Sequence, residues 1–134
     1  MSGESEENMS KEIVFSIMII TTIIIANVFV SHFIDGKLNN IVRNLNEINE
    51  FLENNNYDEA KNKIEELHTY WRENEALLSC YIEHDELEKV KLEYTELKAY
   101  IKSENDQAFA PLYKMIFVIQ HIEQKDDLRI KNIL

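Results

Sequence analysis

One stretch of the chain restricts its fold more than any other: residues 13–34 contain no Asp, Glu, Lys or Arg. A helix over this run would span roughly 33 Å at about 1.5 Å per residue, close to the roughly 30 Å hydrocarbon core of a bilayer. In lipid every backbone amide must be hydrogen-bonded within the segment, and a helix achieves this. We therefore predict a single transmembrane helix over residues 13–34, which makes the chain a single-pass membrane protein.

Two alternatives fit the same run less well. A secretory signal peptide has an apolar region of about 7–15 residues that ends in a small-x-small cleavage site. Here the run is longer and leaves through Val30-Ser31-His32-Phe33, which lacks that pattern. A buried helix of a soluble protein is the other alternative. The preceding residues 1–12 are polar and acidic without apolar periodicity, so we expect a disordered tail there.

The remaining residues have the composition of one small helical domain. With 134 residues the chain has no room for two cores, and two Gly and one Pro argue against the many tight turns of a sandwich or barrel. The net charge of -11 would repel nucleic acid phosphates, so we expect no nucleic acid partner. The only cysteine, Cys80, excludes an internal disulfide.

Apolar residues recur at helical spacing in four segments after the membrane run. The first stripe stops at Asn54-Asn55-Asn56, and the second helix begins near Tyr57. The fold class predicted is all-α: an N-terminal transmembrane helix followed by a small antiparallel bundle of three to four helices over residues 35–124, with a charged C-terminal tail over residues 125–134. The stripes consist of Leu38, Ile41, Val42, Leu45, Ile48 and Leu52; of Ala60, Ile64, Leu67, Trp71, Leu78 and Tyr81; of Leu87, Val90, Tyr94, Leu97 and Ile101; and of Phe109, Leu112, Met115 or Ile116, Ile119 and Ile122.

Three local features decide where these helices begin and break. Gly36 is either a hinge or a position through which the membrane helix continues. Ser103 and Asp106 are the two N-cap candidates before the last helix. Pro111 would kink a helix that started at Ser103, so we prefer a start after Asp106, which moves Pro111 into the tolerated first turns.

The order of several weak motifs resembles a known family of small bacterial membrane-anchored proteins, the domain of unknown function 4363. The motifs are Trp71 before Tyr81-Ile82-Glu83-His84-Asp85-Glu86-Leu87, then Tyr100-Ile101 before Asp106, then Gln120-His121-Ile122-Glu123 and the closing Asn132-Ile133-Leu134. The resemblance implies an N-terminal apolar segment before a helical domain, often encoded beside a larger multi-pass membrane protein. The resemblance does not indicate any particular activity. The acidic start departs from the short basic start of the family.

Histidine positions provide the candidate metal sites. Glu65-x-x-His68 places a carboxylate and an imidazole on one helix face, but a di-iron bundle needs two such pairs and here there is one. Antiparallel helices bring His84 and His121 to the membrane-proximal end, where with His32, Glu83, Asp85 and Glu123 they are weak candidates for a divalent metal or a pH switch. The simpler interpretation is that His84 caps or bridges its turn and His121 is partly buried and bonded to it.

The other candidate residues point to interaction rather than catalysis. Trp71 with Tyr70, Tyr81 and Tyr94 is expected to form core aromatics, with a ligand pocket as the alternative. Cys80 has no paired base, and the sequence has no recognisable catalytic set or cofactor motif, so we expect no enzyme and no cofactor.

Inside the membrane run, the amide of Asn27 favours contact with another helix, whether of a second copy or of a different membrane protein. The alternative is that the amide is simply tolerated near the membrane edge. The leading hypothesis is an interaction module in which Asn27, Trp71 and His84 are the candidate interaction residues. The alternative is an anchored sensor that uses the His-containing end. Lys11 lies on one side of the run and Lys37 and Arg43 on the other, too small a difference to orient it; the family resemblance favours an extracytoplasmic domain.

Overall fold

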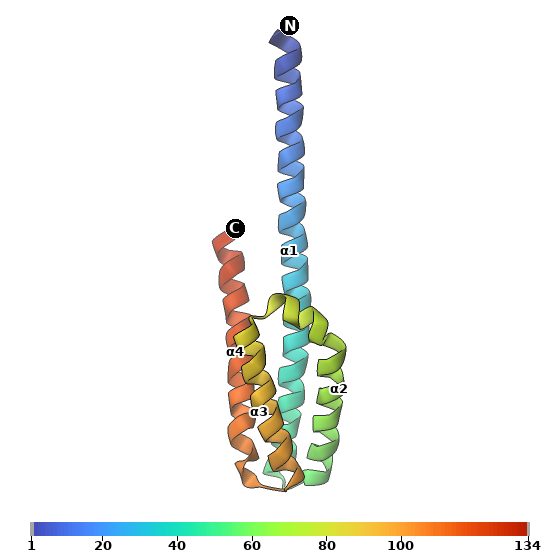
Figure 1. The fold of residues 1–134 in the computed structure, drawn as a ribbon, viewed down its shortest axis with the longest axis vertical. Coiled ribbons are helices and arrows are strands. Elements are labelled where there is room, and N and C mark those ends of the chain that lie inside the picture. Colours follow the sequence, from blue (N-terminus) through green and yellow to red (C-terminus); the bar gives the residue numbers. More distant parts are fainter. Residues whose placement is uncertain (1, 134) are drawn as a thin grey trace. The chain divides into compact units, whose positions relative to one another are not determined.

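The computed structural model describes the backbone of residues 2–133 and, within this range, all side chains except those of Asp126, Ile130 and Ile133. Met1 and Leu134, the last residue of the closing Asn132-Ile133-Leu134 motif, lie outside the described residues. The described residues form α1 (Ser2–Glu53), α2 (Tyr57–Tyr81), α3 (His84–Lys102), a short 3-10 helix η1 (Asp106–Ala108) and α4 (Phe109–Ile133) (Figure 1). The predicted all-α fold class is confirmed.

The chain divides into two compact units, residues 1–33 and 34–134, and α1 contributes to both. The helix runs through Gly36 without a break, so this residue is a continuation point and not a hinge in the structure. Apart from its chain neighbours and the backbone of its own helix turn, no heavy atom lies within 4 Å of the position that a Cβ would occupy at Gly36. Close packing therefore does not demand a glycine there.

The second unit is a four-helix bundle formed by the C-terminal half of α1 with α2, α3 and α4 (Figure 1). Its core follows the stripes expected from the 3,4 spacing, because residues at that spacing share one face of a helix. On α1 the exposed fractions of the core residues are only 0–3 %. The buried apolar residues of the bundle are Ile34, Leu38, Ile41, Leu45, Ile48, Leu52, Ala60, Ile64, Leu67, Leu78, Ile82, Leu87, Val90, Leu97, Ile101, Ala108, Leu112, Met115, Ile119 and Ile122.

Two turns at one end of the bundle have the same backbone geometry. After α1, the amide of Asn56 donates to the carbonyl of Phe51 (2.8 Å) and that of Asn55 to the carbonyl of Leu52 (3.0 Å). This pair of bonds defines a Schellman motif, which requires a left-handed residue, and Asn55 has φ of 54°. The three consecutive asparagines therefore stop α1 as predicted.

The turn after α3 repeats that geometry with an unfavourable residue. The amide of Asn105 donates to the carbonyl of Tyr100 (2.9 Å) and that of Glu104 to the carbonyl of Ile101 (3.1 Å). Glu104 is the left-handed residue, with φ of 55°. A glutamate pays a steric cost in this region that glycine does not.

The start of α4 confirms the preferred position of Pro111 but corrects the cap. Pro111 lies in the first turn of α4, where its missing amide hydrogen removes no helical bond. The cap of the preceding η1 is Asn105, whose side-chain oxygen accepts a hydrogen bond from the amide of Gln107 (2.9 Å), and neither Ser103 nor Asp106 has this role. Ser103 instead donates to carbonyls of its own helix.

Both predicted tails are helical in the structure, which corrects the expectation of disorder at residues 2–12 and of a separate tail after residue 124. At the N-terminus, Lys11 pairs with Glu7 four residues earlier (2.8 Å), an arrangement that supports a helix even without apolar periodicity. At the C-terminus, α4 continues to Ile133, and Lys125 ties it to Glu86 of α3 (2.8 Å). Composition alone does not reveal these polar contacts.

Candidate functional site

Among the described residues, a long run of exposed apolar side chains belongs to α1 before the bundle. An 18-residue window of this helix has a mean hydropathy of 2.7, and none of the window is buried. Phe29, for example, is 72 % exposed. The described residues thus contain one helix that is long and apolar enough to cross a membrane, near the N-terminus, where signal sequences also occur.

Polar side chains in this segment differ in whether they have a hydrogen-bond partner. Thr21 and Thr22 each donate a hydrogen bond of 2.8 Å to the carbonyl four residues earlier, at Ile17 and Met18. Within the described residues, the side chains of Ser16 and Asn27 make no such bond. Asn27 is exposed on the segment, and its amide carries two donors and an acceptor that an apolar environment cannot satisfy.

Ion pairs establish which turns share an end of the bundle. Lys61 of α2 binds Glu104 in the turn after α3 (2.9 Å), and Lys125 of α4 binds Glu86 (2.8 Å) and lies 3.7 Å from Glu83. The first pair connects the beginning of α2, which follows the turn at residues 54–56, with the turn at residues 103–106, and the second connects α4 with the beginning of α3. The neighbouring helices therefore run antiparallel, as predicted.

His84 and His121 lie at that second end, yet each has its own partner. The His84 side chain is 82 % exposed and its Nε2 lies 3.1 Å from a carboxylate oxygen of Glu88. His121 is exposed and its ring stacks on Phe117, with the centroids 6.5 Å apart. His84 is the first residue of α3 and Glu83 is the N-cap residue, so the interpretation of His84 as a cap bonded to a partly buried His121 is wrong.

Glu65 and His68, the other predicted pair, also contact separate partners. Glu65 binds Lys98 of α3 (2.7 Å), and this bond lowers the pKa of the Glu65 carboxyl. The ring of His68 stacks on Tyr94 with the centroids 5.5 Å apart. Among the described residues, no group of three or more His, Cys, Asp or Glu side chains is placed to hold a metal ion. His32 and Cys80 are exposed.

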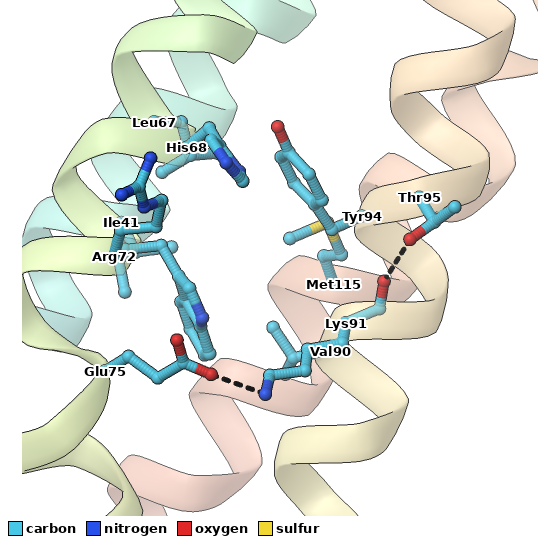
Figure 2. A pocket seen from close by; sticks show the side chains of 11 residues that line it. Ile41, Leu67, His68, Arg72, Glu75, Val90, Lys91, Tyr94, Thr95 and Met115 are labelled. Carbon is cyan, nitrogen blue, oxygen red and sulfur yellow. Dashed lines mark hydrogen bonds and ion pairs between the residues drawn. The ribbon is translucent and has the colours of Figure 1, made fainter.

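Two of the aromatic residues predicted for the core, Trp71 and Tyr94, instead line a cavity. Trp71, Tyr70, Tyr81 and Tyr94 are all half-buried, which corrects their assignment to the core. Trp71 and Tyr94 line a cavity of about 270 Å³ between α2 and α3, whose base includes Ile41 of α1 and Met115 of α4. Figure 2 shows His68 and Arg72 on the α2 side and Tyr94 and Thr95 on the α3 side.

Sequence reasoning missed the polar residues of this cavity. Glu75 of α2 and Lys91 of α3 form an ion pair across it (Figure 2), and Arg72 completes the charged part of its lining. Burial raises the pKa of the Tyr94 hydroxyl, which lies 3.4 Å from the carbonyl oxygen of Ile64. The adjacency of Trp71 and Arg72 on α2 was the available signal, but helical periodicity does not indicate a space between two helices.

Comparison with known proteins gives one match. No curated protein and no solved structure matches the chain. A family model, described as domain of unknown function 4363, matches residues 28–133, which include the end of the apolar segment and the whole bundle. The resemblance expected from the Trp71, His84 and His121 motifs is thereby confirmed, and the chain belongs to the family known as domain of unknown function 4363.

Proposed function

We propose that this chain is a membrane-tethered helical interaction module, an accessory subunit of another membrane protein without catalytic activity of its own. The observation that carries the proposal is the unburied apolar surface of α1 before the bundle, from Ile13 to Phe29. The bundle has a core of its own that does not need this surface. A helix of this length and hydropathy is left available to lipid and to neighbouring membrane helices.

Asn27 provides the contact point in this proposal. Thr21 and Thr22 satisfy their hydroxyl groups on their own helix, whereas the side-chain amide of Asn27 has no hydrogen-bond partner within the described residues. In hydrocarbon, an amide gains about 1–2 kcal/mol in model peptides by bonding to a partner helix. Asn27 therefore favours association over a role for the segment as a simple tether.

The test is co-purification from native membranes after crosslinking, with the wild-type chain compared with Asn27→Leu. We expect the variant to lose most of the crosslinked partner while the helical content of the bundle is unchanged. Thr21→Val is the matched control, because the Thr21 hydroxyl already bonds to the carbonyl of Ile17 on its own helix, and it should retain the partner. Equal recovery of the partner with Asn27→Leu and wild type would contradict recognition through the membrane segment.

A further inference from the structure

The cavity between α2 and α3 is large enough for a small organic molecule. Its volume is about 270 Å³. An engineered apolar cavity of about 150 Å³ is known to bind benzene, and ligand pockets are typically apolar with few, well-placed polar groups. We propose that this cavity binds a small aromatic carboxylate, with the ring between the helices and the carboxylate at Arg72.

The apolar and aromatic side chains that line the cavity favour a ligand with an aromatic ring. Ile41, Leu67, Val90 and Met115 supply an apolar base, and each is nearly or fully buried. Transfer of an apolar ring from water onto such a surface is favourable in proportion to the area covered. The indole of Trp71 and the stacked rings of His68 and Tyr94 add aromatic faces against which a second ring packs well.

The charged side chains that line the cavity favour a ligand with a carboxylate group. Lys91 is already bound to Glu75, so these two charges largely cancel. Arg72 makes no ion pair within the described residues, although the chain carries 25 acidic residues. A guanidinium group presents two parallel N–H donors that match the two oxygens of a carboxylate. The cavity therefore has one unmatched positive charge beside an apolar interior, which suits an aromatic anion better than a neutral or cationic ligand.

Trp71 is the only tryptophan of the chain, so its fluorescence reports occupancy of the cavity directly. The probe is 4-bromobenzoate, whose bromine quenches an indole on contact, titrated into the full-length chain in lipid nanodiscs. We expect saturable quenching in the wild type and a dissociation constant about tenfold or more higher in Arg72→Gln. The neutral 4-bromobenzyl alcohol should bind equally weakly to both.

Two further variants separate the role of Arg72 from a general charge effect. Arg129→Gln removes the same charge from an exposed position on α4 outside the cavity and should bind 4-bromobenzoate like the wild type. Arg72→Lys retains the positive charge but lacks the two parallel N–H donors of the guanidinium group, so it should bind 4-bromobenzoate with intermediate affinity. This variant also tests the role of Arg72 if Arg72→Gln loses helical content. Quenching that rises linearly without saturation in the wild type, or a loss of less than about tenfold in Arg72→Gln, would overturn the proposal.

Discussion

Trp71 illustrates what helical spacing can and cannot resolve at a single residue. It lies on the inward stripe of α2, as predicted, but it is half-buried because it faces the cavity between α2 and α3. The period of the pattern gives the face of the helix on which a residue lies. It does not give the distance to the next helix, which depends on the size of every side chain between them.

This position leads to a smaller expected cost for Trp71→Ala than for a fully buried tryptophan. A fully buried Trp→Ala change costs about 3–5 kcal/mol, whereas here part of the side chain already contacts solvent, so we expect about 1–3 kcal/mol. Denaturant unfolding of residues 34–134, followed by circular dichroism, measures the loss. A cost above about 4 kcal/mol would mean that the indole is enclosed in solution.

Glu123 leads to a prediction about pH. Burial first, and then the carboxylates of Asp35 and Asp127, raise the pKa of Glu123 above its usual 4.5. Because the folded state holds this proton more tightly than the unfolded chain does, the group contributes stability at pH values below its unfolded pKa. That contribution is lost as the pH rises through the folded pKa.

Glu123→Gln should therefore raise the denaturant midpoint at pH 7, and the difference from wild type should shrink as the pH falls through the raised folded pKa of Glu123 towards its usual 4.5. Midpoints measured at pH 4 and pH 7 test this. Glu96→Gln, at an exposed position on α3, is the control and should show no such dependence. A Glu123→Gln variant that is less stable at pH 7 would contradict the assigned sign.

At the scale of elements, the sequence predicted helices and stops better than it predicted caps and ends. Asn54 to Asn56 stop α1 because asparagine tolerates the left-handed conformation. The comparable turn after α3 places Glu104 there, which no propensity argument would choose. The cap at Asn105 was missed because three neighbouring residues, Ser103, Asn105 and Asp106, have equivalent capping ability, and only the backbone path decides among them.

The strain at Glu104 gives a prediction for this turn. Glycine adopts φ near 55° without steric cost, and the exposed Lys61–Glu104 pair contributes little, so Glu104→Gly should be more stable than Glu104→Gln by about 1 kcal/mol. The comparison uses Gln because both variants lose the ion pair and only one relieves the backbone. Thermal unfolding of the two variants is the measurement, and equal melting temperatures would refute the strain.

At the scale of the whole molecule, the bundle is expected to fold without the apolar segment. Residues 34–134 form their own compact unit, and the α1 stripe that joins the core begins at Ile34. A fragment of residues 34–134 should be soluble, predominantly helical and unfold cooperatively, whereas a fragment that starts at Lys37 lacks a fully buried isoleucine and should be less stable. Circular dichroism melting curves that are flat and non-cooperative for both fragments would contradict this.

The proposed role of residues 13–34 is to anchor the bundle in a membrane as a retained helix. Its most direct test is the intact mass of the full-length chain recovered from membranes washed with alkaline carbonate, which removes peripheral proteins. We expect the chain to stay in the membrane fraction at a mass that includes residues 13–34. Release of the chain into the wash, or recovery of a species that lacks this segment as a cleaved signal sequence would leave, would contradict the account.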